Sequence, residues 1–317
     1  MHPDRRLHPP APSRSFSLRL WRTLAALCML LWLGAAGAPG AAAAERGALF
    51  RVTLDGHVMH LFGTMHVGVP GFYPLEPRIA DALQAASTLA LEIDPEQSRT
   101  GMQQALATHG LLAPGERTYD TLAPAQRARL ARLLRQGGFD PVAMLAFKPV
   151  LLATMLTMSE YTRLGYRSDL SSEAWLARTA RAHGVRVTSL ESLGEQLSAL
   201  DRLAEPARWR FLEEMMDTID SGAQHTEAQD IVRAWSMADR AALDRIAAHC
   251  EADQSVSGRF VSQVLLHERN AVLAARLLQL LRAEARAVGA IGVLHLVGSG
   301  SVPALLEQGG AQVERIY

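Results

Sequence analysis

The sequence predicts an α/β fold with a mixed, largely parallel central sheet and long helical insertions. Strand-like apolar runs lie near both ends of the 317-residue chain and near residue 190, and helical periodicity fills the segments between them. Two of the strand-like runs close with the same pattern, Gly-x-x-His, at Gly63–His66 and Gly292–His295. We call these segments the Gly-x-x-His cassettes, and we expect them to bracket one core in a domain over residues 45–317.

The first 44 residues differ from the rest of the chain. Arginines form a basic segment up to Arg22, and an uncharged run rich in leucine and alanine then extends from Thr23 to Ala44. This pattern is typical of a secretory signal peptide, so we expect residues 1–44 to be removed and the protein to be exported to the periplasm. The alternative is an inner-membrane anchor, because residues 23–44 are roughly long enough to span a bilayer.

Composition excludes some classes of partner. The formal net charge is zero and no basic stripe alternates with aromatic residues, so we expect no nucleic-acid partner. Hydrophobic residues make up 49% of the chain, which is enough for a sizeable core. Contact with a membrane is expected only through the leader, if it stays uncleaved. Beyond residue 44 the single cysteine is Cys250, which rules out an internal disulfide.

The elements of the fold follow from local patterns. Residues 48–54 and 57–62 alternate in polarity around Asp55-Gly56, which predicts a β-hairpin. A short amphipathic helix over 79–86 and a strand over 88–94 come next. The remaining elements expected from periodicity are, in order, helices over 97–165, a helix capped by Ser172 over 173–183, a strand over 185–191, helices over 195–285, a strand over 288–294, a helix over 302–308 and a strand over 312–316.

The histidines of the two cassettes are the first candidate site residues. If their strands lie side by side in a parallel sheet, His66 and His295 emerge at the same carboxyl edge, where open α/β sheets hold ligands. Gly63 and Gly292, three residues before each histidine, indicate a close approach of the backbone or a kink. One histidine at a strand end is more often polar surface, but two in matched contexts favour metal binding or acid–base chemistry.

Carboxylates at strand ends are the second group of candidates. Glu92 follows the apolar residues Leu89–Leu91, and Glu191 occupies the equivalent place after the strand near residue 190. Because buried carboxylates are costly unless they are paired or bound to metal, we interpret both as functional. Asp94 precedes a proline, which favours a turn, so it is expected to have a supporting role only.

Two histidines and two carboxylates at one sheet edge would suit a divalent metal. Zinc, manganese, cobalt and iron all accept such ligands. The chain has no His-Glu-x-x-His pattern and no cysteine cluster, so no adjacent motif identifies the metal. It also has no Gly-x-Ser-x-Gly elbow and no phosphate-binding glycine loop, which argues against serine hydrolase, NTPase and Rossmann functions. On a helix, Arg269 would hold a carboxylate of the site or of a substrate; simple surface exposure is the alternative.

The residues resemble the TraB/GumN family over essentially all of residues 47–317. The paired cassettes are the specific part of the resemblance. The other matching segments are Pro74-Leu75, Leu91–Asp94, Phe147–Pro149, Ala174–Leu176, Leu190-Glu191 with Gln196, Trp235, Glu268–Asn270, and Gly310 to Val313.

The resemblance implies a function and a site. The family is similar to the Tiki proteins of animals, which are metal-dependent proteases that cleave the amino terminus of secreted Wnt signals. More distantly it resembles erythromycin-esterase-like and haem-binding proteins. The site that the resemblance implies consists of His66, Glu92, Glu191 and His295, supported by Asn270.

This chain departs from the family pattern at two places. Ser171-Ser172-Glu173 stands where the family commonly has Gly-x-Asp, so Glu173 is expected to replace the aspartate with a longer reach. Ala238 stands where the family usually has glycine after the Trp235 segment. Neither departure touches the cassettes.

Three functional hypotheses follow. The first is an exported metal-dependent peptidase, in which His66, His295 and a glutamate bind manganese, cobalt or zinc. The other glutamate is then the general base, Arg269 orients the substrate, and the choice between Glu92 and Glu191 stays open. The second is a metal-independent, esterase-like hydrolase in which a histidine activates water. The third is a periplasmic protein that binds a metal, haem or small ligand without turnover. The expected partner is a peptide or small-molecule substrate.

Overall fold

The computed structural model describes residues 44–96 and 99–317 of the chain. The predicted leader, whether signal peptide or anchor, lies outside the described residues except for Ala44. Among the helices that are described, none combines the length and the apolar character needed to cross a membrane.

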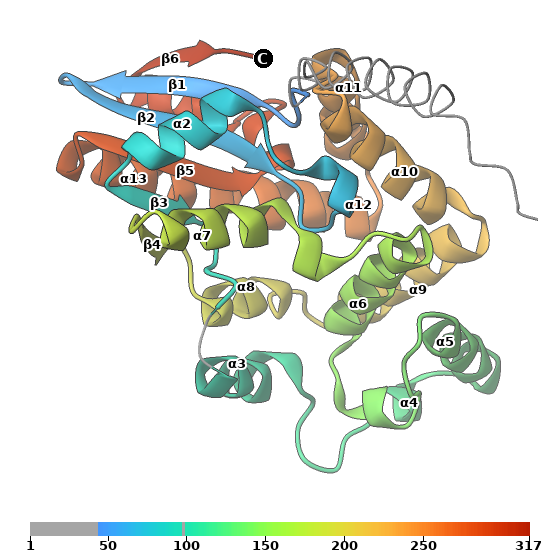
Figure 1. Cartoon of the computed structure of the whole chain (residues 1–317). Coiled ribbons are helices and arrows are strands. Elements are labelled where there is room, and N and C mark those ends of the chain that lie inside the picture. Colours follow the sequence, from blue (N-terminus) through green and yellow to red (C-terminus); the bar gives the residue numbers. More distant parts are fainter. Residues whose placement is uncertain (1–43, 97–98) are drawn as a thin grey trace, which may run out of the picture. The chain divides into compact units, whose positions relative to one another are not determined.

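A six-stranded sheet organises the described part of the chain (Figure 1). The strands run in the order β4-β3-β5-β2-β1-β6. Neighbours among β4, β3, β5 and β2 pair in parallel, whereas β1 is antiparallel to both β2 and β6. The predicted mixed, largely parallel sheet is therefore confirmed. The strand bounds are β1 (Leu49–Leu54), β2 (His57–Thr64), β3 (Thr88–Leu91), β4 (Arg186–Ser189), β5 (Arg286–Gly292) and β6 (Gln312–Arg315).

The predicted hairpin is formed by β1 and β2. Its strands meet at the pair Leu54 and His57, with a two-residue turn between them. Asp55 and Gly56 both have positive φ, 51° and 84°, as the tight turns that match the twist of a hairpin require.

The two cassettes end neighbouring parallel strands. β2 pairs with β5 in a register that sets Gly63 opposite Ile291 and Thr64 opposite Gly292. After its first residue β5 is buried throughout, as expected for a strand with helices on both faces. The parallel pairing brings the histidines that follow each strand to one edge of the sheet.

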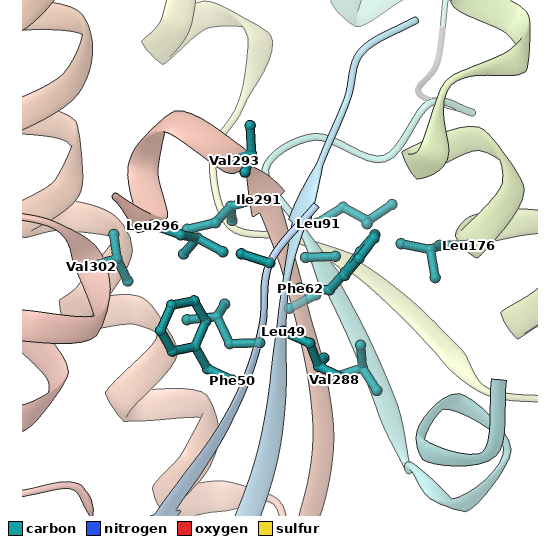
Figure 2. Close-up of a cluster of buried hydrophobic side chains, with 14 of the residues drawn as sticks. Leu49, Phe50, Phe62, Leu91, Leu176, Val288, Ile291, Val293, Leu296 and Val302 are labelled. Carbon is teal, nitrogen blue, oxygen red and sulfur yellow. The ribbon is translucent and has the colours of Figure 1, made fainter. Parts of the chain in front are cut away.

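Helices cover both faces of the sheet. In Figure 1, α2 (Pro77–Ala85) and α7 (Ser172–Ala182) lie in front of the strands and α13 (Arg269–Ala283) lies behind them. The core between these layers is apolar, and Figure 2 shows Phe62, Leu91 and Val288 among its buried side chains. Burial of such side chains is the main term that stabilises the sheet.

Helical insertions separate the strands, as predicted. The segment between β3 and α7 contains α3 (Arg99–Ala105), the π-helix η2 (Leu106–Gly110), α4 (Thr118–Thr121), α5 (Pro124–Gln136), η3 (Ala143–Ala146), α6 (Pro149–Arg163) and η4 (Ser168–Leu170). The segment between β4 and α13 contains α8 (Leu193–Leu200), α9 (Ala207–Asp220), α10 (Ala223–Ser236), α11 (Arg240–Ala252), α12 (Val256–Phe260) and the π-helix η5 (Val261–Glu268). Helices α5, α6 and α9 enclose a second apolar core, which includes Leu134, Leu156 and Met216.

The last part of the chain returns to the sheet. After β5, the short helix η6 (Val293–Leu296) carries the second cassette histidine. Helix α14 (Val302–Gln308) then packs against α13 and leads into β6, and η1 (Pro70–Phe72) completes the described elements.

Some predicted boundaries are wrong. The strand predicted over 88–94 ends at Leu91, and Glu92 lies in a bend beyond it. The helix predicted to be capped by Ser172 is capped by Ser171, whose Oγ accepts a hydrogen bond from Ala174 N at 3.2 Å. Ser172 is engaged elsewhere, because its Oγ accepts from the backbone N–H of Met65 at 2.7 Å.

Candidate active site

The four candidate residues at strand ends lie along one edge of the sheet. Glu191 follows β4, Glu92 follows β3, His295 follows β5 and His66 follows β2, and these four strands are consecutive neighbours. The carboxyl edge of a parallel sheet is the usual position of ligand sites in such folds. Arg269 and Asn270 join them from the start of α13, and Glu173 joins them from the start of α7.

His66 is held by Glu173. Its Nδ1 lies 2.6 Å from Glu173 Oε1, while 61% of the His66 side chain stays exposed. The charge of Glu173, which outweighs desolvation, raises the pKa of His66 to about 9. Burial opposes ionisation of Glu173, but the attraction and hydrogen bond of His66 prevail and lower its pKa. The longer reach expected for Glu173 is thus used to contact His66.

His295 is held in a different way. Only 6% of its side chain is exposed, and its Nδ1 lies 2.6 Å from Asn270 Oδ1. Asn270 Nδ2 donates to the carbonyl of Gly300 at 2.9 Å, so Oδ1 is the acceptor that faces the imidazole. His295 therefore carries its proton on Nδ1 and presents an unprotonated Nε2. Desolvation lowers the pKa of His295 to about 4, which keeps the ring neutral.

Glu92 lies between the histidines and Arg269. Its Oε1 accepts from the N–H of Gly292 at 2.5 Å and lies 3.9 Å from His295 Nε2. Its Oε2 accepts from Arg269 Nη2 at 2.6 Å. Burial works against the charge, but attraction by His295, His66 and Arg269 and the backbone hydrogen bond lower the pKa of Glu92 to about 2. Glu92 is therefore an ionised, buried carboxylate.

Arg269 holds both carboxylates. Besides Glu92, it contacts Glu191, whose Oε2 lies 2.6 Å from Nη2 and whose Oε1 lies 3.2 Å from Nε. Gln196 Nε2 donates to the same two carboxylates, at 3.1 Å to Glu191 and 3.4 Å to Glu92. Arg269 therefore binds carboxylates of the site, as the sequence predicted, and is not simply exposed at the surface. Such an arrangement leaves few acceptor positions of Glu191 open to a substrate.

The side chains converge on Gly292. A Cβ atom at this position would lie 3.2 Å from Glu92 Oε1, 3.4 Å from His66 Nε2 and 3.6 Å from His295 Cδ2. The missing side chain thus leaves room where the two imidazoles and the carboxylate meet. Gly63 has another reason to be glycine, because a Cβ there would lie 2.9 Å from Val293 Cγ2 and 3.2 Å from the Val293 Cα.

The donor set is of the kind that divalent metals bind. Both imidazoles have Nδ1 engaged by an acceptor, an arrangement that commonly orients histidine ligands, and an ionised carboxylate lies between them. As arranged, however, the described residues include no group of three or more His, Cys, Asp or Glu side chains that would hold a metal. The 3.9 Å between His295 Nε2 and Glu92 Oε1 is wider than the usual spacing of two ligands on one ion.

The structure does not bring every predicted residue into this cluster. Asp94 lies apart from the cluster, and its Oδ2 lies 2.6 Å from Arg181 Nη2. The supporting role expected for Asp94 is therefore an ion pair beyond the end of β3, without contact to the cluster. Gln196 was matched only through the resemblance, and its contacts with both glutamates were not predicted. These contacts could have been expected from the position of Gln196, which lies five residues after Glu191 at the start of a helix capped by Ser192.

Comparison with known proteins supports the resemblance seen in the sequence. The model of the TraB/PrgY/gumN family matches residues 48–315. The protein named "Uncharacterized protein YbaP" of Escherichia coli strain K12 is 24% identical over 257 residues, which cover 80% of this chain and 90% of that protein, and YbaP of Shigella flexneri matches to the same extent. No solved structure matches. The family match includes both cassettes and every residue of the cluster, and the chain therefore belongs to the TraB/PrgY/gumN family.

Proposed function

We propose that the protein is an exported hydrolase that uses a divalent metal and acts on peptide bonds. The metal would bind where His66, Glu92 and His295 meet beside Gly292, a group that we call the Gly292 cluster. One observation carries the proposal: two imidazoles, each with Nδ1 engaged, direct Nε2 toward the region of one ionised glutamate. His66, His295 and Glu92 would hold the metal. When bound, a metal such as manganese, cobalt or zinc would supply Lewis-acid activation of water and of the substrate carbonyl.

The surrounding residues have distinct tasks in this proposal. Asn270 keeps the proton of His295 on Nδ1, so Nε2 is ready to act as a ligand. His66 is protonated at neutral pH in the metal-free site, because its pKa is about 9, so the metal must displace a proton from it. Arg269 holds Glu92 and Glu191 at close range, with its Nη2 2.6 Å from an oxygen of each.

Of the two glutamates, we assign Glu92 as the metal ligand. Its Oε1 lies 3.9 Å from His295 Nε2, and Oε1 and His66 Nε2 would lie 3.2 and 3.4 Å from a Cβ at Gly292, whereas both oxygens of Glu191 face Arg269. Glu191 then positions Arg269 instead of transferring a proton.

Metal content is the decisive measurement. The purified full chain, the double variant His66→Ala/His295→Ala and the control His183→Ala would be analysed by inductively coupled plasma mass spectrometry after loading with manganese, cobalt or zinc. His183 is an exposed histidine outside the cluster, so its removal tests for adventitious binding. We expect near-stoichiometric metal in the wild type and in the control, and loss of that metal in the double variant, together with chelator-sensitive peptide cleavage. Equal metal contents in all three proteins would contradict the proposal.

A metal-free hydrolase is the second candidate. It is favoured by the separation of the two histidine pKa values, about 9 for His66 and about 4 for His295, because such a pair divides acid and base roles. His66 would then donate a proton and the neutral His295 would accept one from water. Hydrolysis that persists after exhaustive chelation, but is lost in His66→Ala, would select this candidate. Metal binding without cleavage of any substrate would instead indicate a binding protein.

Export is part of the proposal and has its own test. The leader pattern in residues 1–44 supports it. Amino-terminal sequencing of the protein from a periplasmic extract should read from Glu45. A chain that keeps Met1 and sediments with membranes would indicate the anchor instead.

A further inference from the structure

The loop that follows the second cassette contacts the residue that orients His295. This loop, residues 297–301, connects η6 with α14. Asn270 Nδ2 donates a hydrogen bond to the carbonyl of Gly300 at 2.9 Å, and Asn270 Oδ1 lies 2.6 Å from His295 Nδ1. A carboxamide has a donor end and an acceptor end, so the group that binds one end decides which end faces the imidazole.

The carbonyl of Gly300 therefore selects the tautomer of His295. A carbonyl oxygen only accepts hydrogen bonds, so it binds the Nδ2 end of Asn270 and turns Oδ1 toward the ring. If this carbonyl moved away, rotation of the amide by half a turn would present Nδ2 to His295 Nδ1. The ring would then carry its proton on Nε2, the nitrogen that faces the Gly292 cluster.

The loop backbone has a conformation that needs support from outside. Gly298 and Gly300 have φ of 80° and 63°, and both residues are exposed. Glycine loses more conformational freedom on folding than any other residue. Contacts from another element are therefore needed to hold the Gly300 carbonyl in one place.

Glu251, in the last turn of α11, supplies such contacts. Its Oε1 accepts hydrogen bonds from Ser299 N at 2.7 Å and from Ser299 Oγ at 3.0 Å. A Cβ atom at Gly298 would lie 2.6 Å from the same oxygen, so the carboxylate approaches the loop where only glycine leaves room for it. Because Ser299 directly precedes Gly300, these contacts restrain the backbone next to the carbonyl that Asn270 binds.

We propose that Glu251 is a positioning residue for His295. It acts through the loop and through Asn270, which together keep the proton of His295 on Nδ1 and leave Nε2 unprotonated. That a metal uses this Nε2 rests on the proposed function, whereas the effect of Glu251 on the tautomer does not.

The tautomer of His295 can be measured directly by NMR. The full chain is labelled with ¹⁵N-histidine and studied at neutral pH without added metal, and long-range ¹H–¹⁵N correlations show which ring nitrogen carries the proton. His295→Gln assigns the signals. Glu251→Ala removes the acceptor, and Glu251→Gln removes the charge but keeps an acceptor oxygen. The matched control is Glu307→Ala, because Glu307 is an exposed glutamate in the last turn of α14, the helix that follows the loop.

We expect the Nδ1–H tautomer to exceed the Nε2–H tautomer about tenfold or more in the wild type and in Glu307→Ala. Glu251→Ala should lower this ratio at least about fivefold, which is the effect of losing one hydrogen bond of ordinary strength. Glu251→Gln should keep the ratio of the wild type, because its amide oxygen can still accept from Ser299.

A double variant separates positioning from a general loss of structure. Asn270→Asp offers only acceptors to the ring, so its rotation cannot present a donor to His295 Nδ1. Adding Glu251→Ala to Asn270→Asp should therefore leave the proton on Nδ1. A change of tautomer in this double variant would show that Glu251 does not act through the amide of Asn270.

Two further results would overturn the proposal. An unchanged tautomer in folded Glu251→Ala would show that Asn270 keeps its orientation without Glu251, and an equal change in Glu307→Ala would show that the contact with Ser299 is not the cause. If Glu251→Ala does not fold, Glu251→Asp replaces it with the same expectation, because its shorter side chain withdraws the carboxylate from Ser299. A wild type that binds no metal would contradict the proposed hydrolase and would leave the tautomer result as measured.

Discussion

Nδ1 of His66 lies 2.6 Å from Oε1 of Glu173, a residue 107 positions later in the chain. The first residue follows β2 and the second begins α7, so the contact joins the sheet edge to the helix that lies in front of it in Figure 1. The same junction is held by Ser172 Oγ, which contacts the backbone of Met65. Because α7 carries Glu173, the charge state of His66 depends on where α7 lies.

Replacing Glu173 should lower the pKa of His66. In Glu173→Gln the pKa of His66 should fall from about 9 toward the ordinary value of 6.5, because the largest cause of its rise is the charge of Glu173. A histidine NMR titration measures this directly. The control is Glu195→Gln, in the first turn of α8, which should leave the His66 titration unchanged. An unaltered His66 pKa in Glu173→Gln would show that another group holds the proton.

Removing Arg269 should destabilise the fold strongly. Arg269→Met leaves Glu92 and Glu191 as neighbouring buried carboxylates without a cation, and breaking a buried pair in this way costs about 3–5 kcal/mol. Arg202→Met is the control: it breaks an exposed pair with Glu268 and should leave the unfolding free energy nearly unchanged. Urea unfolding measures both values. Adding Glu191→Gln to Arg269→Met should restore part of the loss, and a failure to do so would argue against mutual repulsion as its cause.

The two cassette glycines should respond differently to alanine. Gly63→Ala would force a Cβ to 2.9 Å from Val293 and should cost about 1–3 kcal/mol of unfolding free energy. At Gly292 the nearest atoms are side-chain atoms of Glu92, His66 and His295, all at 3.2 Å or more, so the stability of Gly292→Ala should fall by less than about 1 kcal/mol. Gly292→Ala should instead reduce metal loading. Equal stability losses in the two variants would contradict these separate roles.

Stability should be greatest near pH 6.5. Between pH 6.5 and 4 the unfolded chain protonates His295 while the folded protein does not, so stability falls as the pH falls, by up to about 3 kcal/mol. Between pH 6.5 and 9 the folded protein keeps the proton of His66 that the unfolded chain loses, so stability falls as the pH rises. This second loss is smaller, because solvent screens the exposed ring.

Urea unfolding at pH 4.5, 6.5 and 8.5 tests the pH profile. His295→Gln should flatten the acidic limb and leave the alkaline limb in place. A stability that only rises with pH in the wild type would contradict the assignment of the raised pKa to His66.

Ala238→Gly should stabilise the protein. Ala238 has φ of 47° and follows the last turn of α10, where its N–H donates to Trp235 O and the next residue, Asp239, donates to Ala234 O. These are the hydrogen bonds of a helix end that usually contains glycine in the left-handed conformation. Glycine at this position should therefore raise the unfolding free energy by about 1 kcal/mol.

The control for Ala238→Gly is Ala241→Gly on an exposed position of α11, which should lower stability by about 1 kcal/mol. Chemical denaturation measures both variants. If Ala238→Gly were as destabilising as Ala241→Gly, the left-handed backbone at Ala238 would not be strained.

Local patterns were sufficient to predict the sheet and the edge where the site lies. Asp55-Gly56 predicts the hairpin because a two-residue turn has its own preferred residues. The cassettes predict neighbouring parallel strands because glycine and histidine recur at the same place in two apolar runs. His66 and His295 therefore meet at one edge, as the sequence predicts.

Contacts between distant segments could not be predicted in the same way. Two adjacent serines were available to cap α7, and the choice of Ser171 depends on Met65, which recruits Ser172. The early end of β3 likewise coincides with the hydrogen bond from Gly292 N to Glu92 Oε1, a contact across 200 residues.

The position of β5 has a consequence for biosynthesis. This strand lies between β3 and β2 in the sheet, yet it is among the last segments of the chain to be made. Until residues 286–292 leave the ribosome, β2 and β3 have no shared neighbour and the helices cannot enclose a finished core. Such long-range pairing slows folding. The sheet and its core are thus expected to stay incomplete until synthesis of the chain is nearly finished, although the second core, which ends at Phe260, does not need β5.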